Sequence, residues 1–273
     1  TSVGSRELKK IIKNPFLNIE KIKQRQFYVD YFYNDVLLRE SIREYLKDIY
    51  DVERIAGKII YGTENGKDLL SLKDSIRKSL ETYRLLREHQ EIKDILDIDV
   101  KILLDIYNKI ELIVNPEAPF SVREGGIIKD GYNSELDELR KISKLGKDFI
   151  LEIEQRERER TGIKGLKIKY NKVFGYFIEV TKANEHLVPE DYIRKQTLVN
   201  SERYIVPDLK EYEEKVITAK SKIEALEYDL FKSLSSEIKE HIESLYKLAN
   251  RIANLDIVSN FAHIATKNSY VKP

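Results

Sequence analysis

Residues 208 to about 267 contain neither glycine nor proline, and this run constrains the fold more than any other feature. Its apolar residues are spaced alternately three and four positions apart, the spacing of a coiled-coil seam. They are Leu209, Tyr212, Val216, Ala219, Ile223, Leu226 and Leu230. The spacing then becomes four, four, four through Leu234, Ile238 and Ile242, a stutter that locally relaxes a supercoil. A continuous helix of about 60 residues would be roughly 90 Å long, so it needs a partner along its seam.

The predicted partner is a helix that starts at Asn133 or Ser134, either of which can cap it. Its apolar positions are Leu136, Leu139, Ile142, Leu145, Phe149 and Ile153. Its last turns read QRERER and contain no apolar residue. We favour a solvated helix end with charge pairs four positions apart, and the alternative is a helix end lying on phosphates. The two long helices are expected to pair antiparallel as a stalk.

The first 113 residues predict a compact helical bundle, because apolar residues recur there every three or four positions. Helices are expected over residues 19–33, 35–46, 52–61, 69–89 and 100–113. Residues 62–68, GTENGKD, superficially resemble a phosphate-binding loop. The resemblance fails because the lysine comes one residue too early, no Ser or Thr follows it, and a helix rather than a strand precedes it.

Residues 162–207 are the only part of the chain that predicts β-structure. Leu166, Ile168 and Tyr170 alternate with polar residues, and aromatic and β-branched residues follow a turn at 171–175. A second strand pair is expected around a polar tip at Asn200 and Ser201. The predicted fold is mainly α, a helical bundle with a long antiparallel two-helix stalk that carries a small inserted antiparallel β-sheet domain at its far end. We divide the chain into a first core segment (1–145), the β-rich domain (146–207) and a long return helix (208–273).

Charge suggests that the β-rich segment meets a polyanion. Residues 162–207 carry a net charge of +3 and the remainder carries −2. Nucleic acid phosphate is the first candidate ligand, and the alternative is a solvated, lysine-rich sheet face.

The predicted contacts are the two turns, Asn171 with Lys172 and Asn200 with Ser201, which the expected strand order places together at one remote end. A lysine offers a point charge to phosphate, while Asn and Ser donate hydrogen bonds without reading bases. These residues could instead be ordinary turn formers. Lys182, Arg194, Lys195 and Arg203 are predicted as supporting basic residues, and residues 182–192 are expected to lie back near the helices.

No catalytic or metal-binding pattern is present in the sequence. Cysteine is absent, and the four histidines stand in unrelated segments without a second histidine at helical spacing. There is no nucleophile elbow and no glycine fingerprint, so we expect a non-enzymatic arm without metal. The sequence contains no apolar run of membrane-spanning length, and we expect a soluble, cytoplasmic protein. The chain also lacks methionine, which suggests an excised fragment.

Five stretches carry a family resemblance along the whole chain. They are GSRELKK, DVERIAGKI, EGGIIKDGYNSELDELR, RERERTGIKGLKIKYNKVFGYFIEVTKAN and PEDYIRKQTLVNSERYIVPDLKEYEEKV. With them the chain resembles the core, lever and clamp portion of the MutS family of DNA mismatch-recognition ATPases.

This resemblance implies a subunit of a homodimer that encircles double-stranded DNA, with the β-rich domain gripping the duplex backbone without reading sequence. The helices would connect this clamp to an ATPase domain that lies outside the chain, as would its ATP and Mg²⁺. The chain departs from the family at Val199, where many members carry a basic residue. A structural helical arm that binds protein rather than DNA remains the alternative, and it predicts a different response to salt.

Overall fold

The computed structural model describes residues 1–171 and 175–273. The predicted contact Lys172 lies outside the described residues, and so do the side chains of Ser2, Asp208 and residues 145–148, 211–212 and 214–217. Two compact units are present, one formed by residues 1–129 with 229–273 and the other by residues 130–228.

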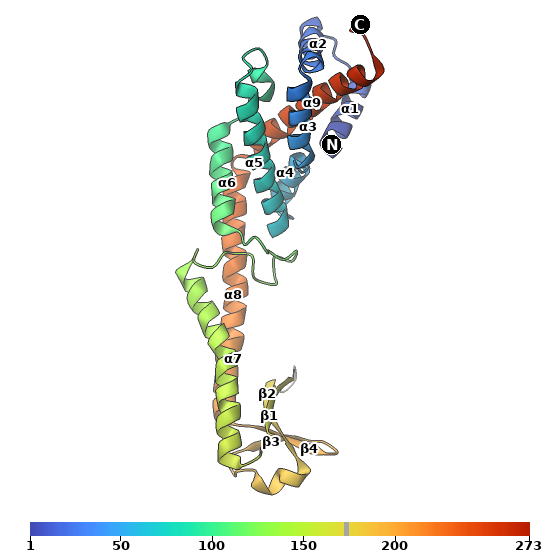
Figure 1. The fold of residues 1–273 in the computed structure, drawn as a ribbon. Helices are drawn as coiled ribbons and strands as arrows, with labels where there is room; N and C mark the ends of the chain where they lie inside the picture. Colours follow the sequence, from blue (N-terminus) through green and yellow to red (C-terminus); the bar gives the residue numbers. More distant parts are fainter. Residues whose placement is uncertain (172–174) are drawn as a thin grey trace. The chain divides into compact units, whose positions relative to one another are not determined.

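The first unit is a helical bundle built around its last helix, α9 (Ile242–Asn268). Helices α1 to α4 pack against α9, as do η1 and α6 (Figure 1). Leu245, Leu248 and Leu255 of α9 are fully buried. The other elements are α1 (Ser2–Lys13), α2 (Ile19–Asn34), α3 (Val36–Lys47), α4 (Val52–Tyr61), α5 (Gly66–Arg87), η1 (Lys93–Leu96) and α6 (Val100–Ile113). The predicted helices are therefore confirmed within a few residues.

The segment that resembles a phosphate loop is a helix cap. The Asn65 side chain accepts from the backbone N–H of Asp68 at 3.0 Å, and the Asp68 side chain accepts from the N–H of Asn65 at 3.1 Å. Gly62, with a φ of +67°, ends α4 in the left-handed region that favours glycine. Residues 62–68 thus form a corner between α4 and α5.

The predicted continuous helix over residues 208–267 is wrong, because it divides into α8 (Pro207–Lys239) and α9. Between them, His241 N–H donates to Ile238 O at 3.0 Å and Ser244 N–H to His241 O at 3.1 Å, and the helix axis changes direction (Figure 1). Burial explains the break. The apolar residues of α9 are covered by several helices of the bundle rather than along one seam, so tertiary packing sets its direction.

The second unit contains α7 (Ser134–Thr161), a four-stranded sheet, η2 (Lys182–Leu187) and the first part of α8. The Asn133 side chain caps α7 by accepting from Leu136 N–H at 2.9 Å. Helices α7 and α8 run antiparallel: Arg140 bonds the buried Glu227 at 2.7 Å, and Ile153 shares a core with Leu209. Along the predicted seam of α8, Ala219 is buried, whereas Ile223 and Leu226 are half-buried.

The sheet is antiparallel throughout and has the strand order β1-β2-β4-β3. Its strands are β1 (Lys167–Asn171), β2 (Gly175–Thr181), β3 (Ile193–Thr197) and β4 (Ser201–Ile205). One face covers an apolar core that includes Leu166, Ile178, Val180 and Tyr204 together with residues of α7 and α8. The mainly helical fold with a small inserted antiparallel sheet is confirmed, while the two predicted domain boundaries, after residues 145 and 207, stay a prediction.

Candidate nucleic-acid interface

The last turns of α7 hold the first strand of the sheet. The Glu154 carboxylate accepts from the backbone N–H of Ile168 at 2.8 Å, and Arg158 Nε donates to Leu166 O at 2.8 Å. Both bonds tie a helix side chain to the backbone at the start of β1. The strand therefore leaves the helix in a fixed position.

A buried carboxylate on the same turns holds the loop before β3. Glu157 is 2% exposed and accepts from the Tyr192 hydroxyl at 3.0 Å, with Arg160 Nε 3.1 Å away. Arg160 also bonds both carboxylate oxygens of Asp191, at 2.8 and 2.9 Å. The expectation of a fully solvated end of α7 is thus wrong for Glu157, because residues 191–192 fold back over it.

The ionisation of these groups follows from the same contacts. Burial raises the pKa of the Tyr192 hydroxyl, and the Glu157 charge raises it further. The hydrogen bond from Arg160 lowers the pKa of Asp191. At neutral pH, Tyr192 is therefore a donor and Asp191 is ionised, as the observed hydrogen bonds require.

The two predicted turns do not lie at the same end of the sheet. Asn171 pairs with Gly175 at the start of β2, whereas Ser201 pairs with Thr181 at its end. The prediction assumed that β4 would run in the same direction as β2. Strand β4 is instead antiparallel to β2 and pairs with it directly. The reason is that η2 and the loop after it return the chain to the other end of the sheet before β3 begins.

Gly175, at the start of β2, lies against α8. A Cβ atom built on Gly175 would meet the carboxylate of Glu213, a residue of α8, at 1.9 Å. Asn171, which pairs with Gly175, is half-buried. Asn171 is therefore at the end of the sheet that faces a helix, contrary to the prediction of a remote tip.

The opposite end of the sheet brings together three of the predicted residues. Lys182 N–H donates to Asn200 O at 3.2 Å, and Leu198 N–H donates to Ser201 O at 2.8 Å. Lys182 and Asn200 are exposed, and Ser201 is half-buried. The expectation that residues 182–192 lie back near the helices holds for Asp191 and is wrong for Lys182, which lies beside the second turn.

The two predicted arginines are engaged within the sheet. Arg203 donates to Gln196 at 2.8 Å, lies 3.5 Å from Glu179 and covers the Phe177 ring at 4.5 Å. Arg194 lies 3.3 Å from the buried Glu202. Part of their charge is therefore neutralised by carboxylates of the same domain.

The two predicted supporting lysines, Lys182 and Lys195, are more available to an anionic ligand than the two arginines. Lys182 and Lys195 are exposed and form no ion pair within the described part of the chain. Lys167 has the same properties, and it was not among the predicted contacts. In the sequence, Lys167 alternates with Ile168, which faces the core, so this pattern already placed Lys167 on the outer face of β1. In the sheet, Lys167 pairs with Glu179, near the end of β2 that Lys182 directly follows.

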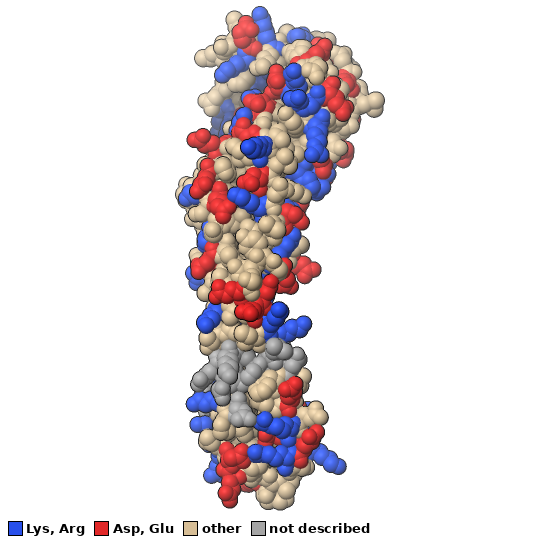
Figure 2. Space-filling view, turned by 90° about the vertical axis from the view of Figure 1, so that its left-hand side faces the viewer, with Lys and Arg blue, Asp and Glu red and all other residues tan. Residues whose placement is uncertain are grey.

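Charge is mixed on the face of the molecule that Figure 2 draws. On the face drawn in Figure 2, Lys and Arg side chains alternate with Asp and Glu side chains. On the outer face of the sheet, Lys169 is paired with Glu179 at 2.7 Å. Any attraction of a polyanion is therefore local, and it depends on the lysines without partners.

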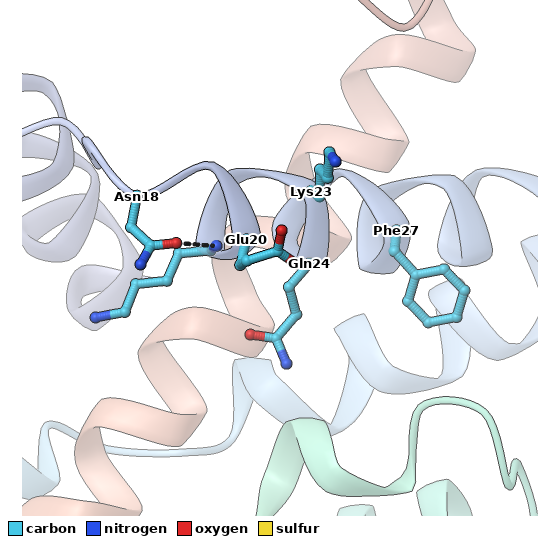
Figure 3. A pocket seen from close by; sticks show the side chains of 6 residues that line it. Asn18, Glu20, Lys23, Gln24 and Phe27 are labelled. Atoms are coloured by element: carbon cyan, nitrogen blue, oxygen red, sulfur yellow. Dashed lines mark hydrogen bonds between the residues drawn. The ribbon is translucent and has the colours of Figure 1, made fainter.

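A shallow hollow along α2 is lined by Asn18, Glu20, Lys23, Gln24 and Phe27, whose side chains point in different directions (Figure 3). Within residues 1–171 and 175–273, no group of three or more acidic or histidine side chains could hold a metal ion. No helix among these residues is long and apolar enough to cross a membrane.

Comparison with known proteins places the chain in a family. The family model of MutS domain III matches residues 1–262. The chain belongs to the MutS family. It is 95% identical to a DNA mismatch repair protein MutS of Fusobacterium nucleatum subsp. nucleatum, over all of this chain and 30% of the relative.

More distant MutS relatives align over the same extent. DNA mismatch repair proteins MutS of Alkaliphilus oremlandii and Methanosarcina barkeri are 45% and 43% identical, over all of this chain and 31% of each relative. The chain therefore spans about 30% of the length of the MutS relatives it matches.

Proposed function

We propose that this chain is the lever and clamp part of a DNA mismatch-repair protein. Its sheet domain binds the backbone of duplex DNA without reading sequence, and its helices couple that domain to an ATPase carried by the rest of the longer MutS chain. ATP and Mg²⁺ belong to that ATPase, so this chain has no ATPase activity of its own. A second MutS subunit is the proposed protein partner. The match to MutS domain III over residues 1–262 carries this proposal.

We assign the DNA contact to the end of the sheet that holds Lys182, Asn200 and Ser201. Lys167 and Lys195 add exposed, unpaired charge in the same domain, and Lys182 lies beside the second turn. A lysine and neutral donors such as these suit phosphate contacts, which position a duplex without specifying its sequence. Asn171 is a weaker candidate, because its strand partner Gly175 lies against α8.

Fluorescence anisotropy with a labelled duplex at two salt concentrations tests this assignment. We expect non-specific affinity of roughly 10⁻⁴ to 10⁻⁶ M that falls steeply with salt, because phosphate contacts release counterions. The double variant Lys182→Glu with Lys195→Glu should bind all duplexes more weakly, and its salt slope should shrink by about one for each lost contact. Lys141→Glu with Lys144→Glu is the matched control, because both lysines are exposed on α7 in the same unit and the change in net charge is the same.

Equal losses in the two double variants would show that only net charge matters and would remove the contact from this end of the sheet. A DNA affinity that does not change with salt concentration would favour the alternative of a protein-docking arm. A clear preference for mismatched over matched duplex would contradict the proposal that the clamp reads no sequence.

A further inference from the structure

A cavity in the helical unit has features that DNA binding by the sheet does not explain. It lies between α1, the loop after α1, α2 and α9, and it has a volume of about 350 Å³. All of its walls belong to the first compact unit. Most of its lining residues have a polar or charged group, and apolar atoms make up about half of the lining: Glu7, Ile11, Phe16, Lys21, Gln24, Arg25, Tyr28, Asn250, Arg251 and Asn254.

Arg25 is the central residue of this cavity. Its guanidinium stacks on the Phe16 ring, 4.1 Å from the centroid. Its Nε atom is buried, and within the described part of the chain it donates to no acceptor. Burial lowers the pKa of Arg25, an effect that the charge of Glu7 opposes. A buried N–H donor on a charged group raises the free energy of the folded state when it lacks an acceptor, so a bound acceptor near Arg25 would stabilise the fold.

The charges around Arg25 leave the cavity positive. Lys21 and Arg251 line it together with Arg25, and Glu7 is its only carboxylate among the described residues. The Glu7 carboxylate also forms an ion pair with Lys10 at 3.2 Å, and Arg251 forms one with Asp97 at 3.6 Å. Neither Lys21 nor Arg25 forms an ion pair within the described residues.

Neutral donors complete the site. Asn250 and Asn254 stand one turn apart on α9, and Gln24 is one residue before Arg25 on α2. Gln24 donates to the Tyr28 hydroxyl at 3.3 Å, so its amide is held at the cavity wall. Cations and amide donors around a small open cavity match the oxygens of an anion and repel a cation.

We propose that this cavity binds one oxyanion group, a phosphate or a carboxylate, with Arg25 as its main ligand. Arg25 donates to an oxygen of the anion, Lys21 and Arg251 supply further positive charge, and the amides of Asn250 and Asn254 complete the contacts. The cavity volume lies at the lower end of the range for ligand sites, which suits a single small group.

The whole chain is suited to a direct test by NMR of arginine Nε–H groups. The Arg25 signal is identified as the one missing from the Arg25→Lys spectrum. Inorganic phosphate and acetate are added separately, with sodium chloride at matched ionic strength as the reference. We expect the Arg25 signal to shift saturably with phosphate or acetate and not with chloride, while the signal of Arg54, which is exposed on α4, stays unchanged. Tighter binding of phosphate than of acetate indicates a phosphate ligand, and the reverse order indicates a carboxylate.

Two variants make the test quantitative. Arg25→Lys keeps the positive charge and loses the planar guanidinium with its several N–H donors, so affinity should fall about tenfold or more, the effect of one lost charge-assisted hydrogen bond. Lys21→Gln changes an exposed residue, preserves the fold, and should weaken binding severalfold. Lys101→Gln, an exposed lysine on α6, should have no effect.

A drift of the Arg25 signal that is equal in phosphate, acetate and chloride would overturn the proposal. Equal affinity in wild type and Lys21→Gln, with Arg25→Lys folded and binding normally, would overturn it too. The DNA test is independent of this one, because Lys182→Glu with Lys195→Glu changes the other unit and should leave phosphate binding intact.

Discussion

Two buried carboxylates, Glu157 and Glu202, organise the sheet domain, and each has several donors. Glu202 is 4% exposed and lies within hydrogen-bond distance of Tyr204, Thr197 and Arg194. Burial, together with the Glu202 contact, raises the pKa of Tyr204 to about 12. The two carboxylate charges are tolerated in the interior because their oxygens accept hydrogen bonds from several donors.

Removing one donor from Glu157 should therefore cost stability. Tyr192→Phe deletes the hydroxyl that donates to Glu157 at 3.0 Å, and we expect a loss of about 1–2 kcal/mol in the free energy of unfolding, measured in urea. Tyr170→Phe is the control, because the Tyr170 ring is 54% exposed. A Tyr192→Phe loss no larger than that of the control would contradict the structural role of the Tyr192 hydroxyl.

Asp51, the N-cap of α4, is expected to make a pH-dependent contribution to the free energy of unfolding. Arg6 donates to its carboxylate at 2.7 Å, and this hydrogen bond lowers the pKa of Asp51. A lowered folded-state pKa stabilises the fold above the unfolded value of about 3.9, and the contribution disappears as pH falls through the folded-state pKa. Because Arg6 is 43% exposed, the effect should be about 0.5–1 kcal/mol.

The variant Asp51→Asn keeps a good N-cap and loses the charge. Its melting temperature should be lower than that of wild type at pH 7, and the difference should shrink toward pH 3. A difference that is constant with pH would mean that the charge of Asp51 contributes nothing.

At the scale of elements, the sequence predicted most helices and strands because each has its own local signal. The alternation around Ile168 located β1, and Pro207 located the start of α8. Strand pairing had no such signal, since the direction of β4 depends on how η2 and the loop to β3 cross the sheet. For the same reason the burial of Glu157 was missed: its partner Tyr192 lies 35 positions away.

The start of β2 depends on glycine at position 175. Gly175 has a φ of +75°, in the left-handed region, and an added Cβ would meet Glu213. Gly175→Ala should therefore destabilise the chain by at least about 1–2 kcal/mol, the cost of the left-handed conformation alone. Gly165→Ala is the matched control, because a Cβ there meets nothing within 4 Å. Equal melting temperatures for the two variants would show that position 175 does not need glycine.

At the scale of the whole molecule, the two compact units predict separable local stability. Ile110 is fully buried in the helical unit, and Ile110→Ala should cost about 2–4 kcal/mol there. Hydrogen exchange measured by mass spectrometry should show faster exchange in the bundle helices of Ile110→Ala and in the sheet of Tyr192→Phe. If each variant raised exchange equally in both units, the chain would unfold as a single cooperative body.

The first unit is closed by its last helix, since α9 packs against α1 to α4, η1 and α6. During synthesis on the ribosome, residues 1–129 emerge before the 130–228 segment and must wait for α9. At about 5–20 residues per second, that intervening segment alone takes roughly 5–20 s to translate. The apolar faces of the early helices lack their central partner throughout this time, whereas the sheet domain can form as one contiguous stretch. During synthesis, residues 1–129 are therefore more exposed to chaperones and proteases than residues 130–228, although they are translated first.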